Sequence, residues 1–449
     1  MGKRKGEKHS MLVTILAFLF ILAFSVTIHE FGHFLIAKLF KIPVEKFSIG
    51  YGPPLIRKKI GETDFRIAYF PLGGYVKIAG EDEGEITQKN TEHTEKKSRE
   101  ATEEIRDVPG FYDAPIYKRV LIVLSGPLFN IVSAVFVFIA VIGIYGMLIN
   151  PYMRIEVEPD TAADYAGLIT RDSIVSISGL MVNDWDEASE ILAAREGKTI
   201  SIGLMRDRTY LEKEMLIKLD SLGIVPLVPP ILGSLKLDGP AQKAGMKTGI
   251  RILQIDDVKI DSWNQMIEIV RESRNIPLRF VWEERGEIKE AEITPVPFYD
   301  PLSEDTIGQI GAVMPLERRH LPLTDVVSLS VQRSGEVLWL TLKTLYQLIV
   351  GRISRRSIGG PIAIAQLSGE SARWGFENLL GLLAIISINL GLINLFPIPA
   401  LDGGHVVISM IEATRKKRFS HRTRLIIQQV GYAIILLLVI FITFNDITR

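Results

Sequence analysis

Long uncharged runs of apolar residues divide the chain. They are Met11–Ile28, Val120–Ile149, Leu379–Leu401 and Leu425–Phe444. Each run has about 18 residues or more, which is enough for a helix to cross the hydrocarbon core of a bilayer. A cleaved signal peptide fits the first run poorly, because no small-residue cleavage site follows it. The pattern predicts a polytopic α-helical membrane protein with four transmembrane helices, in contact with the lipid bilayer.

Three shorter patterns lie between these runs. Val337–Val350 is apolar but interrupted by Lys343, which predicts an amphipathic helix on the membrane surface. Phe65–Ile78 alternates around a glycine pair, which predicts a re-entrant β-hairpin or β-loop at the membrane. Residues 79–113 are dense in charge and poor in apolar positions, which is typical of a solvated linker.

The long segment between the second and third runs contains an internal repeat with an offset of 78 residues. Ala163 and Gly167 align with Ala241 and Gly245, and Trp185 aligns with Trp263 without a gap. Self-similarity of this kind predicts two copies of one small α+β domain, each of roughly 75 residues. Each copy reads as short strands with a helix after its tryptophan.

These patterns predict the organisation of the whole chain. The predicted segments are 1–40, the N-terminal tail and first transmembrane helix; 41–117, a loop with the β-loop 65–78 and the linker 79–113; 118–150, the second transmembrane helix; 151–220 and 221–300, the two repeated domains; 301–376, an amphipathic membrane-surface segment; 377–405, the third transmembrane helix; 406–424, a basic loop; and 425–449, the fourth transmembrane helix and C-terminal tail.

Charge narrows the choice of function and of orientation. The chain has 52 Lys and Arg against 52 Asp and Glu, so it offers no electrostatic case for binding nucleic acid. Cysteine is absent, which excludes thiolate nucleophiles and cysteine-ligated metals. Basic residues are dense over 406–424 and also occur in the first loop. The positive-inside rule therefore places both loops in the cytoplasm, although the basic N-terminal tail points the other way.

The candidate chemistry begins at the end of the first apolar run. His29-Glu30-Phe31-Gly32-His33 is an HExxH motif. On a helix, positions i and i+4 share a face, so both imidazoles can bind one Zn²⁺ while Glu30 acts as the base that deprotonates water. The alternative is a structural His/Glu cluster, but ionisable groups at membrane depth are costly unless they function.

A third ligand is expected at the end of the third apolar run. Asp402 is the first charge after that run, and the first and third spans must point the same way because one span separates them. Pro397 and Pro399 break the helix just before it, which lets the carboxylate turn inward. The alternative for Asp402 is a helix-ending Asp-Gly turn. His405 is a further possible ligand, but a structural role nearby is favoured because two histidines and one aspartate already complete the set.

Polar and small residues inside the second and third spans are further candidates for the site. Gly126, Pro127 and Asn130 are expected to pack the second span against the first. Asn389 and Asn394 are placed to bind an unwound substrate or to stabilise an oxyanion. A role in hydrogen bonding between helices is almost equally compatible with these two amides.

At this point the motifs resemble the site-2 protease family of intramembrane zinc metalloproteases, over nearly the whole chain. The blocks that carry the resemblance are HEFGH, FSIGYGP (Phe47–Pro53), PLGGYVKI (Pro71–Ile78), LSGPLFN, GGPIAI (Gly359–Ile364) and NLFPIPALDGGH (Asn394–His405). The two repeated domains look like the tandem PDZ modules of the type found in Gram-negative bacteria. Arg171-Asp172 departs from the Gly-Asp expected in such a module.

The resemblance implies residue roles, with one Zn²⁺ per chain. His29, His33 and Asp402 would be its ligands and Glu30 the catalytic base. Five residues of the β-loop would receive substrate as an added strand, together with contacts from Asn389 and Asn394. These five are Gly73, Gly74, Tyr75, Val76 and Lys77.

The resemblance also implies a location and a pathway. The protein would lie in the bacterial inner membrane, with periplasmic PDZ modules and a zinc site toward the cytoplasmic side. It would make the second cut in a single-span membrane protein, such as an anti-sigma factor in a stress response, or cut signal-peptide remnants. Two rivals stay open: a catalytically silent, membrane-anchored PDZ scaffold, and a metal transporter that uses the same residues as a passage site.

Overall fold

The protein is described here by a computed structural model, which describes residues 2–80, 110–300, 305–352 and 359–448. Most of the predicted linker 79–113 lies outside these residues. The chain divides into two units. The membrane unit comprises Met1–Ile144, Pro322–Ala372 and Phe376–Arg449, and the second unit comprises Tyr145–Leu321 with Arg373–Gly375.

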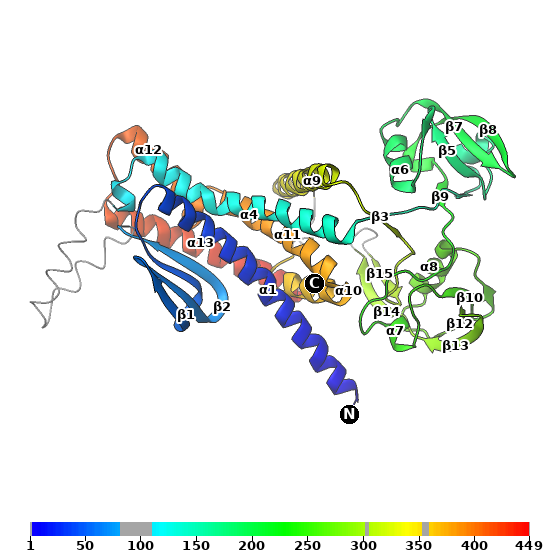
Figure 1. The fold of residues 1–449 in the computed structure, drawn as a ribbon, viewed down its shortest axis with the longest axis horizontal. Helices are drawn as coiled ribbons and strands as arrows, with labels where there is room; N and C mark the ends of the chain where they lie inside the picture. The colour runs from blue at the N-terminus through cyan, green and yellow to red at the C-terminus, as the bar shows by residue number, and fades with distance from the viewer. Residues whose placement is uncertain (1, 81–109, 301–304, 353–358, 449) are drawn as a thin grey trace, which may run out of the picture. The chain divides into compact units, whose positions relative to one another are not determined.

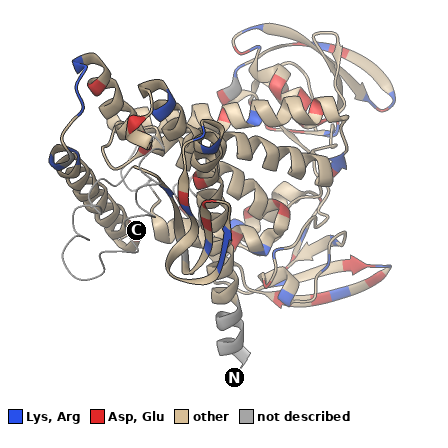
Figure 2. Ribbon diagram, turned by 60° about the vertical axis from the view of Figure 1, so that its left-hand side comes forward, with Lys and Arg blue, Asp and Glu red and all other residues tan. Residues whose placement is uncertain are grey.

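Within the described residues, four helices are long and apolar enough to cross a membrane, which confirms the predicted multi-pass protein. They are α1 (Gly2–Leu39), α4 (Ile116–Tyr145), α11 (Phe376–Asn394) and α13 (His421–Thr448). Figure 2 shows long stretches of these helices without Lys, Arg, Asp or Glu. Helices are required here because a bilayer offers no partners to exposed backbone amides and carbonyls.

Small residues allow the spanning helices to approach one another closely. A Cβ added at Gly32 of α1 would lie 2.5 Å from the Ser125 carbonyl oxygen of α4. A Cβ at Gly391 of α11 would lie 2.7 Å from the Pro127 carbonyl oxygen. Close helix crossings in membranes rely on such glycines, so α4 lies against both α1 and α11.

A curved antiparallel sheet packs beside α1 in the membrane unit. It consists of β1 (Val44–Ile60) and β2 (Thr63–Ile78), and both strands are long enough to bend and pair twice. Residues 44–49 pair with 74–78 on one side, and 46–49 pair with 64–67 on the other, while 54–60 pair with 63–68. The stretch 74–78 is therefore one edge of a four-stranded arrangement.

The expectation that 65–78 forms a hairpin by itself is wrong. The chain reverses at Gly61 and Glu62, where Ile60 pairs with Thr63. Gly73 instead bends β2 without reversing it: its φ of +111° marks a bend that favours glycine. The partner strand β1 is the segment that the alternation pattern did not single out.

The remaining helices of the membrane unit surround these elements. They are η1 (Phe111–Asp113), α9 (Leu323–Ile349), α10 (Pro361–Trp374) and α12 (Asp402–Arg415). The helix α9 extends well before the predicted amphipathic stretch at 337–350. The basic segment 406–424, expected as a loop, is helical as far as Arg415.

The second unit contains two modules with the same topology. Their sheets have the strand orders β6-β5-β7-β8 and β11-β10-β12-β13. The first module has α5 (Ala162–Tyr165), β5 (Ser173–Ile177), β6 (Leu180–Met181), α6 (Trp185–Ala193), β7 (Thr199–Arg206) and β8 (Thr209–Leu216). The second has α7 (Pro240–Lys243), β10 (Arg251–Ile255), β11 (Val258–Lys259), α8 (Trp263–Glu272), β12 (Leu278–Glu284) and β13 (Glu287–Ile293).

Short elements complete this unit. They are β3 (Met147–Ile149), β4 (Ile155–Val157), η2 (Leu219–Ser221), β9 (Ile224–Pro226), β14 (Val296–Asp300), β15 (Asp305–Gln309) and β16 (Glu317–Arg319).

Equivalent positions of the sequence repeat explain the shared topology. The residue before each aligned tryptophan caps the following helix. Asp184 accepts a hydrogen bond from the Glu187 amide at 2.9 Å, and Ser262 accepts one from the Gln265 amide at 3.2 Å. Each module then closes over its own apolar core.

Candidate metal centre and active site

The HExxH motif lies within α1, and its two histidines face one another. Because they are one helical turn apart, Nε2 of His29 lies 3.2 Å from Nε2 of His33. His29 is buried and His33 is largely so. Glu30 follows His29 on the same helix.

Asp402 completes the group from the other end of the chain. It is the first residue of α12, after the turn 395–401 that contains Pro397 and Pro399. Its Oδ2 lies 3.0 Å from Nε2 of His29, and its Oδ1 lies 3.7 Å from Nε2 of His33. Among the described residues, these three side chains form the group with ligand atoms close enough to share one metal ion.

The three ligand atoms fit a tetrahedral zinc ion. Zinc bonds to nitrogen and oxygen of about 2.0–2.2 Å put neighbouring ligands of a tetrahedron about 3.3 Å apart. Nε2 of His29 lies 3.2 Å from Nε2 of His33 and 3.0 Å from Oδ2 of Asp402, which agrees with that spacing. The other carboxylate oxygen of Asp402, Oδ1, lies 3.7 Å from Nε2 of His33. Oδ2 of Asp402 is also buried without a hydrogen-bond partner among the described residues, as expected for an oxygen that binds a cation.

Hydrogen bonds from α4 orient both imidazoles. Nδ1 of His33 lies 2.8 Å from the Ile122 carbonyl oxygen. That oxygen can only accept, so Nδ1 carries the proton and Nε2 is left with a free lone pair toward the site.

Asn130 occupies the equivalent place beside His29. Its amide group lies 3.2 Å from Nδ1 of His29, and its Oδ1 is buried without a partner in the described structure. When the oxygen and nitrogen of this amide are exchanged, Nδ1–H of His29 donates a hydrogen bond to Oδ1 of Asn130, and Nε2 is free to bind a metal. Asn130 was expected only to pack the spans together, whereas its contact is with a predicted ligand.

Gly126 is where the second span touches the site. A Cβ at this position would lie 2.4 Å from Nε2 of His33 and 2.8 Å from Nε2 of His29. The next residue, Pro127, lies inside α4 and cannot donate a backbone hydrogen bond there. Glycine is therefore required for α4 to approach both imidazoles.

The edge strand 74–78 passes beside Glu30. A Cβ at Gly74 would lie 3.4 Å from Cγ of Glu30, and the Val76 amide is within hydrogen-bonding reach of the Glu30 carboxylate. The hydroxyl of Tyr51 donates to the Gly74 carbonyl oxygen at 2.9 Å. The edge of the sheet and the predicted base thus face the same space.

The other predicted substrate-binding residues are less closely tied to this site. Tyr75 stacks on Tyr51, with ring centroids 6.0 Å apart, and Lys77 lies 3.7 Å from Glu45. Oδ1 of Asn389 accepts a hydrogen bond from Thr341 of α9 at 2.8 Å, which is the interhelical alternative. Asn394 is half-buried at the end of α11.

Two contributors were not predicted from the sequence. Tyr51 lies in the FSIGYGP block, for which no contact with the site was expected. The backbone carbonyl of Ile122 can be recognised only once α4 is seen beside His33. The sequence signal available was the apolar helix that carries LSGPLFN.

Two histidines on one helix, a carboxylate and a glutamate beside them define a metallohydrolase of the HExxH class within a membrane-spanning fold. Residues 17–438 match the model of peptidase family M50. The chain belongs to peptidase family M50, which confirms the predicted family and a hydrolase of the metalloprotease class.

Relatives match the chain over almost its full length. A protein of Neisseria meningitidis, described as a candidate zinc metalloprotease, is 31% identical, covering 97% of this chain and 99% of the relative. The regulator of sigma E protease of Haemophilus influenzae is 31% identical over 98% of this chain and 100% of its own length. RseP of Salmonella typhimurium is 30% identical over 98% of this chain and 99% of its own length. The name of the Neisseria protein agrees with the expected Zn²⁺ cofactor.

Solved structures of PDZ domains were also matched. The PDZ domain of an SdrC-like protein from Listeria monocytogenes is 17% identical, with a TM-score of 0.16, covering 20% of this chain and 93% of that domain. A likeness this slight carries no weight for the fold of either module.

Proposed function

We propose that the chain is an intramembrane zinc endopeptidase with His29, His33 and Asp402 as its metal ligands and Glu30 as its base. The observation that carries this proposal is the convergence of these three side chains, whose nearest nitrogen and oxygen atoms lie 3.0–3.7 Å apart. Two of them come from α1 and the third from α12, about 370 residues later. The group lies at the end of a helix long and apolar enough to span a membrane.

The residues around the proposed metal site have separate roles in peptide hydrolysis. His29, His33 and Asp402 would hold Zn²⁺, which would supply Lewis acidity toward a bound water and the scissile carbonyl. Glu30 accepts the proton from the attacking water and then delivers it to the leaving amine. Ile122 and Asn130 hold the imidazoles in one orientation throughout, because each engages an Nδ1 atom.

A substrate is proposed to bind along residues 73–77 as an added strand. A transmembrane helix must first unwind, because its carbonyls are occupied in i→i−4 hydrogen bonds. Pairing with the edge strand beside Glu30 replaces those bonds at the place where the chemistry occurs. Tyr75 and Lys77 belong to the same edge strand. Asn394 is the last residue of α11.

The natural substrate is proposed to be a single-span membrane protein. Relatives named regulators of sigma E protease favour an anti-sigma factor, cut second in a regulated pathway. Signal-peptide remnants are single apolar helices too and would meet the same requirement. Multi-pass helices and these relatives together favour the bacterial inner membrane.

The two repeated modules are proposed to be PDZ-like and periplasmic, with the metal centre toward the cytoplasm. In the first module, Asp172 accepts a hydrogen bond from the Ile169 amide at 2.9 Å and pairs with Arg206 at 2.7 Å.

The rival functions make different use of the same residues. A silent scaffold would have no need of a glutamate facing an open strand edge. A transporter would need a continuous path with successive sites, whereas the described residues show one ligand group. The arrangement of base, ligands and strand edge favours hydrolysis.

Zinc analysis of purified protein tests the assignment of the ligands. We expect about one Zn²⁺ per chain in the wild type and a large loss in Asp402→Ala. The control is Asp113→Ala, which changes an exposed aspartate of the same unit. Equal zinc in Asp402→Ala and wild type would refute the ligand assignment.

A further inference from the structure

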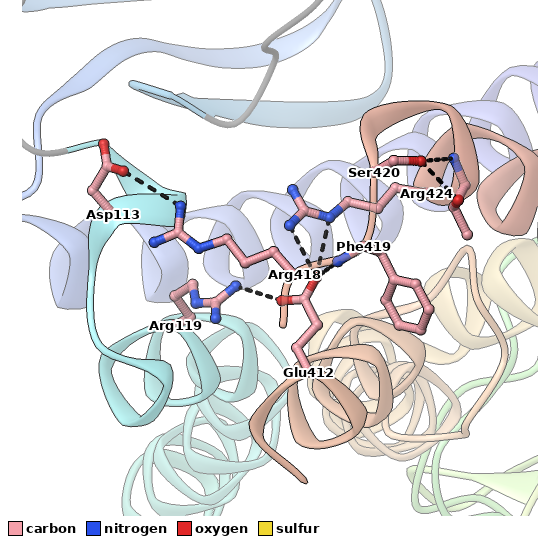
Figure 3. Close-up of polar contacts among 8 residues, drawn as sticks. Asp113, Arg119, Glu412, Arg418, Phe419, Ser420 and Arg424 are labelled. Atoms are coloured by element: carbon pink, nitrogen blue, oxygen red, sulfur yellow. Dashed lines mark hydrogen bonds and ion pairs between the residues drawn. The ribbon is translucent and has the colours of Figure 1, made fainter. Parts of the chain in front are cut away.

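A buried cluster of charged residues lies in the membrane unit outside the ligand group (Figure 3). Its centre is Glu412 of α12, which is 3% exposed. Oε2 of Glu412 accepts a hydrogen bond from Nη1 of Arg119 at 3.0 Å, and Oε1 accepts one from Nη2 of Arg424 at 2.9 Å. The Phe419 amide donates to Oε1 at 2.9 Å. One carboxylate thus joins α4, α12 and α13.

The cluster holds its charges in a fixed geometry. The guanidinium of Arg424 lies 3.9 Å from the ring centroid of Tyr112, which covers one of its faces. Burial raises the pKa of Glu412, but hydrogen bonds from Phe419, Arg119 and Arg424 outweigh it and hold that pKa below its usual range. The carboxylate therefore stays charged. Buried ionic groups of this kind add little net stability, but they can specify one arrangement of helices.

The helix α12 carries the cluster and the proposed metal ligand on one face. Asp402, Ser409 and Glu412 are separated by seven and then three residues, a spacing that keeps them on one side of a helix. Ten residues of helix put Glu412 about 15 Å along the axis from Asp402. The hydrogen bonds of Glu412, called the clamp below, therefore fix the rotation and the axial position of the helix that carries Asp402.

The helix α4 shows the matching arrangement. Arg119, Ile122, Gly126 and Asn130 follow at intervals of three, four and four residues, again on one face. Arg119 binds Glu412, whereas the other three contact the histidines. The same face of α4 thus connects the clamp to the imidazoles.

We propose that Glu412 is a positioning residue for the metal centre, which holds α12 in register with α4 so that Asp402 meets His29 and His33. This inference rests on the proposed function, because it takes Asp402 as a ligand. Glu412 itself contacts neither metal nor substrate. Its effect passes through the rigid helix between residues 402 and 412.

Metal binding without catalysis tests the proposal. The affinity for Zn²⁺ is measured by chelator competition on the full-length protein, and the visible absorption of Co²⁺-loaded protein reports the ligand geometry. For Glu412→Gln we expect about a tenfold weaker Zn²⁺ affinity and altered Co²⁺ bands, as when residues that orient ligands are replaced. Arg119→Lys keeps the positive charge and should lose less Zn²⁺ affinity than Glu412→Gln does.

The matched control is Glu62→Gln, which removes an exposed carboxylate that pairs with Lys38 at the β1–β2 turn. It should retain the wild-type affinity and spectrum. If Glu412→Gln shows them too, even with a lower melting temperature, the cluster only stabilises the fold and the proposal is refuted.

Two further outcomes are informative. If Glu412→Gln does not fold, Arg424→Lys is measured in the same way; a weakened affinity supports the proposal and a wild-type affinity refutes it. If the wild type itself binds no metal, the ligand assignment fails and the inference falls with it. A failure confined to the Glu412 variant leaves the proposed function intact.

Discussion

At the scale of single residues, Gly126 sets how closely α4 can approach the histidines. A methyl group there has too little space, because it would lie 2.4 Å from Nε2 of His33. We predict that Gly126→Ala lowers zinc affinity by about 10–100-fold and lowers cleavage in proportion, since the imidazoles must turn away from the metal. Zinc analysis and a cleavage assay on the purified variant measure both effects.

Gly143→Ala is the control for this substitution. It lies on the same helix, and its added Cβ would be 3.9 Å from Val326, an ordinary contact. Alanine also favours helix more than glycine does, so this variant should bind zinc and cleave as the wild type does. Equal zinc affinity in Gly126→Ala and Gly143→Ala would show that the approach of α4 does not limit the site.

Glu284 in the second module predicts a pH dependence of local stability. Hydrogen bonds from Lys247 and Lys289, at 2.6 and 2.7 Å, lower the pKa of Glu284 to about 2 from its usual 4.5. A depressed pKa means that the carboxylate stabilises the fold fully above pH 4.5 and loses that contribution as the pH falls toward 2. Hydrogen exchange of β12 in the full chain, at pH 6 and at pH 3, measures it.

The comparison is with Glu284→Gln, which should lose less protection between the two pH values than the wild type does. Glu290→Gln serves as the control, because Glu290 is exposed and lies 3.8 Å from Arg279 on the same sheet. If the wild type and Glu284→Gln lose the same protection, the role assigned to Glu284 and its two lysine partners is wrong.

At the scale of elements, the edge strand of the β1–β2 sheet is the proposed docking strand. The Val76 amide points away from β1, toward Glu30. Val76→Pro removes this donor, which contacts Glu30 at the strand edge, and the loss of one hydrogen bond, about 0.5–1.5 kcal/mol, should lower kcat/KM by about 2- to 10-fold. Zinc content should not change, because no ligand belongs to β2.

Lys59→Pro gives the matched substitution on the opposite edge. Ile60 and Thr63 flank a two-residue turn, so the Lys59 amide also points away from its partner strand. This variant should cleave as the wild type does. Equal cleavage by Val76→Pro and Lys59→Pro would leave the strand-addition proposal without support.

The sequence predicted the features that depend on local residue spacing or on the order of the membrane spans. Apolar runs predicted the spans, and helical spacing paired His29 with His33. The parallel direction of the first and third spans brought Asp402 to the same side. These inferences need only periodicity, and they located the group that the structure brings together.

Contacts between distant segments could not be predicted in this way. Arg119 and Glu412 are 293 positions apart, and no local pattern connects them. The pairing of β1 with β2 was missed for the same reason, since the glycine pair at 73–74 resembled a turn whereas the reversal lies at Gly61. Asn130 was recognised as an interhelical residue, but its contact with His29 depends on how two helices cross.

At the scale of the whole molecule, the proposed orientation has a direct test. The chain contains no cysteine, so a single introduced thiol reports its own side of the membrane. In spheroplasts, a membrane-impermeant maleimide should label Asp207→Cys, in the β7–β8 turn, and should label Lys417→Cys only after permeabilisation. Both positions are exposed. The reverse labelling pattern would invert the proposed topology.

The account as a whole depends on Glu30 acting as the base beside a bound metal. The most direct measurement is cleavage of a model single-span substrate by purified protein, wild type beside Glu30→Gln, with zinc content determined for both. We predict that both hold about one zinc, that only the wild type cleaves, and that the products map within the apolar segment. Two zinc-loaded proteins that both fail to cleave several such substrates would contradict the account and favour the scaffold.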